Sequence, residues 1–197
     1  MKLYHSPGAC SEAPNIVLRE AGIPFDVVKV DLKAKRLESG EDYLAINSKG
    51  SVPALALDDG NLLTENAAVL QYIADQAPHA GLLPPLGTME RYRVLEWLNF
   101  IATELHKGFG PLWKPSGDPA AREAAVAALE KKFDYVQQRL GDAPYLTGAR
   151  FTIADAYLFA VLRWTRIHQI DLARWPGLVA LVDRIGERPA VREALAG

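Results

Sequence analysis

The chain contains a single cysteine, Cys10, whose position gives the first indication of chemistry. A short segment that suits a strand precedes it and a stretch with helical periodicity follows it, so we expect Cys10 at the start of a helix. The free N–H groups and partial positive charge of a helix N-terminus favour a thiolate, which lowers the thiol pKa and makes the sulfur nucleophilic near neutral pH. The alternative is a small buried residue that fills a gap in the core.

Ser11, the next residue, also has two interpretations. Its hydroxyl can donate a hydrogen bond to the sulfur of a ligand held beside Cys10, or it can cap the helix that begins here. The sequence contains no Cys-x-x-Cys pair, which excludes a disulfide cycle within the chain. Any redox role of Cys10 therefore needs an external thiol.

Val52-Pro53 and Glu65-Asn66 are suited to hold an extended ligand near this cysteine. A cis bond before Pro53 is uncommon in general, but at this point of the predicted fold it would turn the Val52 N–H and C=O toward a peptide-like ligand. Glu65 and Asn66 begin a predicted helix, whose amides can receive a carboxylate while Asn66 donates and Glu65 accepts from an ammonium group. From these two residues alone, an acidic helix cap is the favoured interpretation.

A polar row on a later helix carries a histidine. Asn99, Thr103 and His106 are spaced by four and three residues, which places them on one helical face, and Glu104 and Lys107 form a second pair. Such a row is usually the solvated face of a helix, and a lone histidine is more often structural than catalytic. His106 becomes a candidate for holding or exchanging a proton only if this helix borders the Cys10 cleft.

The elements that must position these residues divide the chain into two parts. Up to residue 77, strand and helix patterns alternate in the order β-α-β and then β-β-α, which is the order of a thioredoxin-like domain. The predicted elements are strands at 2–5, 25–30, 54–57 and 62–64, helices at 12–21 and 65–77, and one short helix near 42–46.

Only helical patterns follow the segment 78–87, which is rich in proline and glycine. The predicted helices cover 88–112, 119–140 with Asp118 as the N-cap, 152–167, 178–187 and 190–196. Helix 152–167 is apolar on nearly all sides, which is typical of the centre of a bundle, and Thr152 and Asp155 form a capping box at its start. The sequence therefore predicts an α/β thioredoxin-like N-terminal domain at 1–80, followed by an all-α helical C-terminal domain at 87–197.

The composition restricts the function further. A formal net charge of −2 gives no electrostatic reason to expect nucleic acid or a membrane surface as a partner. No apolar run approaches the roughly 18 residues needed to span a bilayer, and the first residues lack the pattern of a signal peptide. A single cysteine cannot form a disulfide within the chain, which fits a reducing compartment. Together these features predict a cytoplasmic protein. The four histidines are scattered without ligand spacing, so we expect no metal site.

Taken together and in order, the motifs resemble those of a bacterial beta-class glutathione transferase. The resemblance covers nearly the whole chain and rests on Ser6-Pro7-Gly8-Ala9-Cys10-Ser11, Val52-Pro53-Ala54-Leu55, Leu63-Thr64-Glu65, Glu104-Leu105-His106-Lys107, and Leu146-Thr147-Gly148 followed by Thr152-Ile153-Ala154-Asp155. Val-Pro-x-Leu is common across the transferase superfamily, whereas the cysteine loop with the later His-Lys pair is specific to the beta class. The resemblance implies the glutathione transferase architecture, glutathione as co-substrate, and a homodimer.

The resemblance also implies roles for individual residues. Cys10 would face the glutathione sulfur and form a mixed disulfide with it, and His106 would lie close to that pair. The Val52 backbone, beside Pro53, would pair with the cysteinyl unit. Glu65 and Asn66 would hold the γ-glutamyl end. Further expected contacts are Ser11, Lys35, Asn99, Thr103, Glu104 and Lys107, with Glu104 a candidate to reach from the partner subunit.

The chain departs from the family pattern at two positions. Asn66 stands where serine is usual, which keeps a hydrogen-bond donor but alters the geometry of the site. His5 stands where tyrosine is frequent, which weakens any role for an aromatic hydroxyl beside Cys10.

We therefore expect the conjugation of glutathione to small hydrophobic electrophiles, with peroxide reduction or thiol–disulfide exchange through Cys10 as further activities. The hydrophobic half of the cleft would come from the helical domain, around Phe109, Leu112, Trp113 and Trp164. Two alternatives remain: a non-enzymatic protein that binds hydrophobic ligands, and a dedicated glutathione-dependent dehalogenase. The sequence does not separate them, because substrate choice depends on the shape of the cleft.

Overall fold

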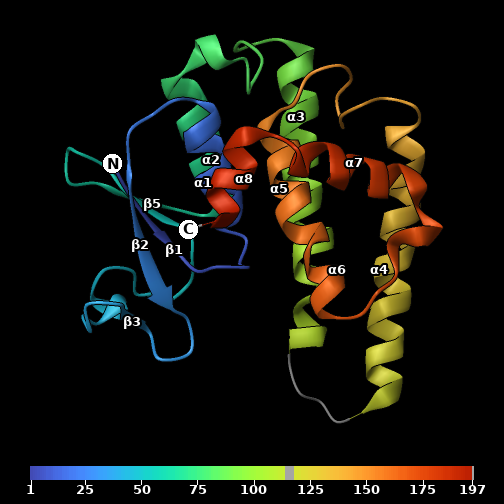
Figure 1. The fold of residues 1–197 in the computed structure, drawn as a ribbon, viewed down its shortest axis with the longest axis horizontal. Coiled ribbons are helices and arrows are strands. Elements are labelled where there is room, and N and C mark those ends of the chain that lie inside the picture. The colour runs from blue at the N-terminus through green and yellow to red at the C-terminus, as the bar shows by residue number, and fades with distance from the viewer. Residues whose placement is uncertain (114–117, 197) are drawn as a thin grey trace.

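The computed structural model describes residues 1–113 and 118–196, which form a sheet-containing part and a helical part side by side (Figure 1). The sheet has five strands in the order β3-β2-β1-β4-β5, and β1 pairs in parallel with β2 while the other pairs are antiparallel. The elements of this part are β1 (Lys2–His5), α1 (Glu12–Glu20), β2 (Asp26–Asp31), β3 (Arg36–Leu37), β4 (Ala54–Ala56), β5 (Leu62–Thr64) and α2 (Asn66–Gln76). The predicted thioredoxin-like order is confirmed.

Alternation along β1 explains how both faces of the sheet are covered. Leu3 joins the main core with α1 and α2, whereas its neighbour Tyr4 joins a second cluster on the other face. There Tyr4 packs against Tyr43, with ring centroids 5.7 Å apart. Tyr43 belongs to the 3-10 turn η1 (Tyr43–Ala45), which stands where the short helix was expected. Strand β3 was not predicted, because two residues are too few to show alternation.

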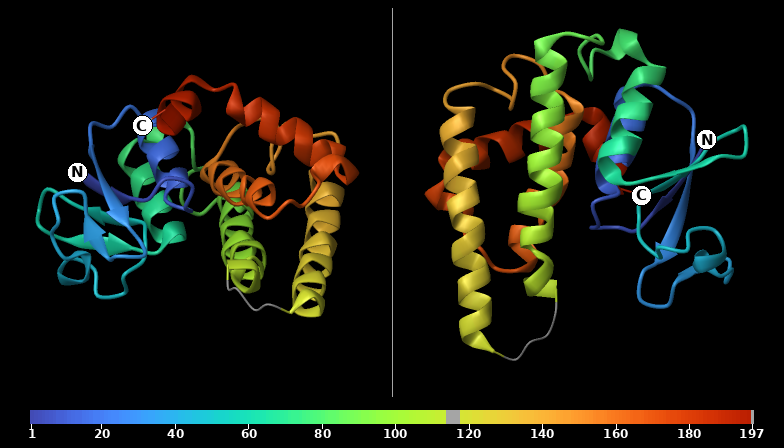
Figure 2. Two further views of the ribbon diagram at one scale, coloured as in Figure 1. Left: turned by 60° about the horizontal axis from the view of Figure 1, so that its bottom comes forward. Right: turned by 180° about the vertical axis from the view of Figure 1, so that it is seen from behind.

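The second part is built of helices (Figure 2). Its elements are η2 (Pro78–Ala80), α3 (Met89–Phe100), η3 (Ile101–His106), η4 (Gly110–Trp113), α4 (Pro119–Leu140), α5 (Ile153–Leu162), α6 (Trp164–Ile167), η5 (Leu172–Arg174), α7 (Pro176–Gly186) and α8 (Pro189–Ala196). The long helices α3 and α4 run side by side in both figures, and α8 returns to pack against α1. Residues 114–117 and 197 of the predicted helical domain lie outside the described residues.

Helix α5 lies at the centre of this part, as its apolar composition predicted. All of its residues are buried. The predicted capping box is confirmed at its start, where the Thr152 N–H and hydroxyl both donate to Asp155 Oδ2 at 2.9 Å. The Leu146 N–H donates to the other carboxylate oxygen at 2.8 Å. Burial nevertheless raises the pKa of Asp155 to about 6.

Two predicted helices are interrupted. The helix expected over 88–112 is α-helical only as far as Phe100, continues as the π-helical turn η3 and ends in the 3-10 turn η4. The helix expected over 152–167 ends at Leu162, and α6 begins after Arg163. No proline or glycine lies at either break, so the apolar periodicity continued through both and hid them. A π turn of this kind is frequent at functional sites.

The two parts share one continuous core, which contains residues from Leu3 to Ala194. Polar contacts add to it where α8 and the end of α7 meet α1. Arg188 donates to both carboxylate oxygens of Glu20, at 2.6 and 2.8 Å, and the Asn15 side chain donates to the Ala194 carbonyl at 3.3 Å. Side chains that reach a common cleft from the two parts are therefore held in a fixed relation.

Candidate functional site

A cleft of about 630 Å³ lies between the sheet and the helices and is lined from both parts of the chain. Eight of the predicted site residues line it: Cys10, Lys35, Val52, Pro53, Glu65, Asn66, His106 and Lys107. These residues come from the turn after β1, the connection between β2 and β3, the segment before β4, the start of α2 and the end of the α3–η3 helix. The fold therefore gathers the cysteine and the histidine in one place.

Cys10 lies in the turn between β1 and α1, as predicted, but its thiol is not activated there. The S–H donates to the Val52 carbonyl at 3.3 Å, and the side chain is only 7% exposed. Burial raises the pKa of Cys10 to about 12, and the charge of Glu65 adds to the rise. The nearby backbone N–H groups and Lys107 offset only part of it. The expected lowered pKa is therefore wrong, because desolvation outweighs the helix N-terminus.

The Val52–Pro53 peptide bond is cis, as expected. Strand β4 begins one residue later, at Ala54, where the pairing with Tyr4 of β1 starts. The Val52 backbone therefore lies just outside the strand ladder, beside Cys10. Its carbonyl already accepts the Cys10 S–H, which places this backbone segment within reach of any ligand that contacts the sulfur.

The start of α2 combines a strained backbone with an unpaired buried acceptor. Glu65 has a φ of 72°, in the left-handed region that favours glycine, and its side chain makes no capping hydrogen bond but pairs with Lys49 at 2.6 Å. The Asn66 amide donates to the Cys10 carbonyl at 3.1 Å, while Asn66 Oδ1 is buried without a hydrogen-bond partner among the described residues. The helix-cap interpretation of this pair is therefore wrong for the Glu65 side chain, and the two features favour a binding role.

His106 is held by a neighbour that the sequence did not suggest. Its Nδ1 lies 2.7 Å from the Tyr157 hydroxyl, and both residues line the cleft. Burial, with the charge of Lys107 as a smaller cause, lowers the pKa of His106 to about 4. Burial also raises the pKa of Tyr157, with a hydrogen bond from Asn66 as a partial offset. Both side chains are therefore neutral near pH 7.

Tyr157 is the main residue that sequence reasoning missed. It lies in α5, the helix predicted to be apolar on nearly all sides, and it is 2% exposed. The available signal was its hydroxyl, because a phenol in a fully buried helix needs a polar partner. That requirement would have directed attention to the facing residues on α3 and η3.

An aromatic wall closes the helical side of the cleft. Of the four predicted hydrophobic residues, Trp113 and Trp164 line it, together with Ile167. Phe109 does not: it is fully buried behind Trp164, with ring centroids 5.5 Å apart. Leu112 also packs against the core instead of lining the cleft.

Ser11 does not reach the cleft. Its side chain is fully buried, its hydroxyl lies 2.9 Å from His5 Nδ1, and it accepts the Ser6 N–H at 3.1 Å. The side-chain helix cap, one of the two expected roles, is not found. Ser11 instead fixes the base of the Cys10 loop.

Asn99, Thr103 and Glu104 also lie outside the cleft, on the exposed face of the α3–η3 helix. Thr103 donates to the Asn99 carbonyl at 3.0 Å, and Glu104 pairs with Lys132 of α4 at 3.0 Å. The expectation that Asn99 and Thr103 share a face with His106 is wrong, because the π turn η3 changes the helical register before His106.

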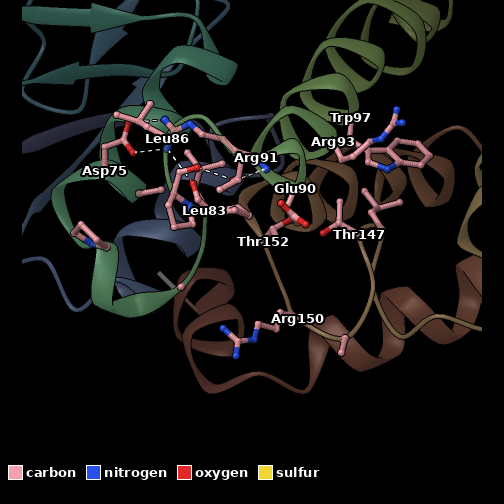
Figure 3. Close-up of a pocket in the computed structure, with 18 of the residues that line it drawn as sticks. Asp75, Leu83, Leu86, Glu90, Arg91, Arg93, Trp97, Thr147, Arg150 and Thr152 are labelled. Carbon is pink, nitrogen blue, oxygen red and sulfur yellow. Dashed lines mark hydrogen bonds and ion pairs between the residues drawn. The ribbon is translucent and has the colours of Figure 1, made fainter.

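A larger groove of about 1170 Å³ lies elsewhere, between the 78–88 segment, the start of α3 and the loop 146–152 (Figure 3). Arg91 crosses its wall to bind both carboxylate oxygens of Asp75, at 2.9 and 2.8 Å. The described residues that line this groove include no cysteine and no histidine. Thiol and proton chemistry therefore points to the cleft at Cys10.

The described residues contain no group of three or more histidine, cysteine, aspartate or glutamate side chains arranged to hold a metal ion. Nor does any helix within residues 1–113 and 118–196 have the length and apolarity to cross a membrane.

Comparison with known proteins gives two family matches. Residues 1–75 match the model of the glutathione S-transferase N-terminal domain, and residues 100–189 match that of the C-terminal domain. A curated relative, glutathione S-transferase GstA of Escherichia coli O157:H7, is 52% identical over 196 residues, which cover 100% of this chain and 98% of the relative.

Solved structures agree with this match. A sphingomonad glutathione S-transferase complexed with glutathione superposes with a TM-score of 0.95 at 46% identity, covering 100% of this chain and 98% of that one. The bacterial beta-class glutathione S-transferase of Sphingomonas chungbukensis gives a TM-score of 0.95 at 47% identity, with the same coverage.

Proposed function

The chain belongs to the glutathione S-transferase family, and from that premise we propose that it joins the thiol of glutathione to small hydrophobic electrophiles in the cleft beside Cys10. Glutathione is the co-substrate, as in the family. The observation that carries the proposal is that the cleft has two halves. Backbone and polar groups around Val52 and Asn66 form one half, and the aromatic wall of Trp113 and Trp164 forms the other.

Glutathione is an extended peptide with carboxylates at both ends and an ammonium group at one. In the proposed pose the Val52 backbone pairs with its cysteinyl unit. The γ-glutamyl carboxylate meets the amides at the start of α2, where Asn66 lies, and the ammonium group meets Glu65. Lys35 and Lys107, which line the cleft, supply positive charge for the remaining carboxylate. Residues 1–80 would form this glutathione-binding domain, and residues 87–197 would supply the hydrophobic site.

The sulfur of glutathione, not that of Cys10, is the nucleophile in this proposal. Tyr157 stays protonated and its hydroxyl lies 2.7 Å from His106 Nδ1, so we assign its O–H as the donor to that nitrogen. His106 then carries its proton on Nε2 and offers that N–H to the glutathione sulfur, which stabilises the thiolate once the thiol proton has passed to solvent. The thiolate attacks the electrophilic carbon, the new C–S bond forms, and the leaving group departs with its electron pair.

Thiol–disulfide exchange is the second candidate, favoured by a cysteine that lines the cleft. Here the Cys10 thiolate attacks a mixed disulfide of glutathione and a second small thiol, forms a protein–glutathione disulfide and releases that second thiol as its thiolate. A glutathione thiolate then attacks the protein–glutathione disulfide, which forms glutathione disulfide and regenerates Cys10. The raised pKa of Cys10 makes its thiolate scarce at neutral pH, so we expect exchange to be slower than conjugation.

We also propose a homodimer, in which the exposed face of α3 and η3 meets the partner subunit. This face carries Tyr92 and Met89, which are 55% and 63% exposed, as well as Asn99, Thr103 and Glu104. A dimer would bring those polar residues closer to the partner's cleft, as the resemblance implied for Glu104. Light scattering should give twice the chain mass, and Tyr92→Glu should shift the protein toward the monomer. We place the enzyme in the cytoplasm, which cell fractionation tests.

The test of conjugation is the initial rate with an activated aryl chloride at saturating glutathione. We expect saturable turnover that persists in Cys10→Ala and falls in His106→Ala, with the folded fraction of each variant checked by circular dichroism. Tight binding of hydrophobic ligands without turnover on any electrophile would instead indicate a binding protein. Chloride release from chlorinated alkanes at rates above aryl conjugation would indicate a dehalogenase.

A further inference from the structure

The loop that carries Cys10 is tied to the helical part of the chain through both backbone groups of Gly8. The Gly8 N–H donates to Glu12 Oε1 at 2.8 Å, and the Gly8 carbonyl accepts the indole N–H of Trp164 at 2.7 Å. The second oxygen of Glu12 lies 3.1 Å from Arg163 Nη1. Arg163 and Trp164 are consecutive residues at the break between α5 and α6. We call Glu12, Arg163 and Trp164 the Gly8 clamp.

Burial makes the contacts of the clamp strong. The Glu12 side chain is only 6% exposed, so its carboxylate depends on Arg163 and the Gly8 N–H for compensation. Trp164 is 3% exposed, and its indole N–H has the Gly8 carbonyl as its partner. Gly8 itself has a φ of 77°, which other residues rarely adopt. The loop therefore holds an unusual backbone conformation through groups supplied by the helical part.

Trp164 also contacts the other side of the reaction centre. Its ring packs edge-on against His106, with centroids 4.9 Å apart and planes at 78°. A single side chain thus borders both the Cys10 loop and the histidine. In the proposed pose both Cys10 and His106 lie beside the glutathione sulfur. The position of Trp164 therefore affects the distance between them.

We propose that Arg163 and Trp164 are positioning residues for the reaction, acting through Gly8 to hold the Cys10 loop against His106. The break after Leu162 places these two residues side by side and so gives the clamp its geometry. The part of the proposal that concerns turnover rests on the proposed function. The part that concerns the loop does not, because it can be measured on Cys10 alone.

Trp164→Phe tests the clamp, since it removes the indole N–H and keeps an aromatic ring. Trp175→Phe is the matched control: Trp175 is 2% exposed, and its indole N–H donates to Asp134 at 2.7 Å, away from Gly8. The readout is the alkylation rate of Cys10 by iodoacetamide, followed by intact mass. A buried thiol reacts only when its surroundings open, so a looser loop reacts faster.

We expect alkylation to rise about tenfold in Trp164→Phe, the change associated with one lost buried hydrogen bond, and to stay within about twofold of the native rate in Trp175→Phe. The control excludes global unfolding as the route, because each variant loses one part-buried hydrogen bond donated by an indole N–H and keeps an aromatic ring. Equal alkylation rates in the two variants would overturn the proposal.

The kinetic arm uses the same pair with glutathione and an aryl chloride. In Trp164→Phe we expect kcat to fall about tenfold or more and the KM for glutathione to change less, because the loop and the ring of Trp164 border the proposed position of the glutathione sulfur beside His106 and not the ends of the peptide. If the native protein shows no turnover, the proposed function fails, while the alkylation arm still decides on the clamp. Unchanged kcat in Trp164→Phe with an active native enzyme would reject the positioning role.

Arg163 is tested by conservative rescue. Arg163→Met removes the charge opposite buried Glu12, whereas Arg163→Lys keeps it. We expect the faster alkylation and the lower kcat in Arg163→Met, with substantial recovery in Arg163→Lys. If Arg163→Met does not fold, Glu12→Gln with native Arg163 provides the comparison, since it keeps an acceptor for Gly8 but loses the ion pair. No effect in any of these variants would contradict a role for Arg163.

Discussion

The sulfur of Cys10 donates a hydrogen bond to Val52 and lies almost out of contact with solvent, so deprotonation requires both the loss of that bond and a charge in an apolar surrounding. This raises the thiol pKa to about 12. The dependence of Cys10 alkylation on pH follows directly. Because only the thiolate reacts, the rate should keep rising up to pH 10 without a plateau. Free glutathione is the reference thiol in the same buffer.

An alkylation plateau below pH 8 would contradict this, since it would reveal a Cys10 thiolate at neutral pH.

Cys10→Ala should give no adduct after treatment with glutathione disulfide, because Cys10 is the only cysteine in the chain. The variant should still bind glutathione through the remaining contacts. A mass increase of one glutathione on Cys10→Ala would contradict Cys10 as the site of the mixed disulfide.

Tyr157→Phe tests the proposed state of His106. The substitution keeps the ring but removes the hydroxyl that lies 2.7 Å from His106 Nδ1. We expect kcat for conjugation to fall by about 10- to 100-fold, because His106 loses the group that fixes its tautomer. The KM for glutathione should change little. Tyr135→Phe is the control, since its ring packs against Trp97 and Phe100, away from the cleft. Equal kcat values for the two variants would contradict the role of Tyr157.

At the scale of the elements, the start of α2 stores strain at the position that should meet the ligand. Glu65→Gly relieves a φ of 72°, whereas Glu65→Ala keeps the strain, and both lose the contact with Lys49. We expect Glu65→Gly to be more stable than Glu65→Ala by up to about 1 kcal/mol, because strain relief exceeds the added flexibility of the unfolded chain. The KM for glutathione should rise in both variants.

Urea denaturation and glutathione titration measure these two effects separately. A Glu65→Gly variant that is less stable than Glu65→Ala would contradict stored strain at this position. A KM for glutathione that stays at the native value in both variants would remove Glu65 from the binding site.

Most elements were predictable from the sequence, because burial imposes a period on them. The apolar stripes of α1 and α4 follow from which side of each helix faces the core. The breaks at Ile101 and Arg163 were not predictable, since both lie within unbroken apolar periodicity and contain no proline or glycine. Yet these two breaks set the register of His106 and the place of Trp164. The misplacement of Asn99 and Thr103 therefore comes from an interruption that leaves no local signal.

For Cys10 the sequence predicted the position of the residue but not the protonation state of its thiol. The position of Cys10 at a helix start was predictable from the pattern around it. Its protonation was not, because the pKa depends on burial by segments distant in sequence, including Val52 and Glu65. Ser11 was misjudged for a related reason, since its partner His5 lies inside a strand whose facing residues the sequence does not show.

At the scale of the whole molecule, three buried titratable groups contribute to how stability changes with acid. Burial lowers the pKa of His5 and of His106 to about 4, so each contributes stability that is present above pH 6.5 and lost as the pH falls toward 4. Burial raises the pKa of Asp155 to about 6, which acts in the opposite sense: its contribution is present at low pH and lost as the pH rises through 6.

Between pH 6 and 4 the unfolded state carries protons on both histidines, whereas the folded state carries one on Asp155. Unfolding therefore takes up a net of about one proton. We expect the free energy of unfolding to fall by roughly 1.4 kcal/mol per pH unit in this range. Urea denaturation at several pH values measures the slope. His5→Asn, which keeps a polar partner for Ser11, should make the slope shallower. Stability that increases from pH 6 to pH 4 would contradict the assignment of buried neutral histidines.

The whole account depends on where glutathione lies between the two parts of the molecule, and a crystal structure with glutathione bound tests that directly. We predict the glutathione sulfur beside Cys10 and His106, its cysteinyl backbone paired with Val52, and its γ-glutamyl carboxylate at the start of α2. Glutathione bound in the groove at Asp75 and Arg91, or held with its sulfur turned away from both Cys10 and His106, would contradict the account.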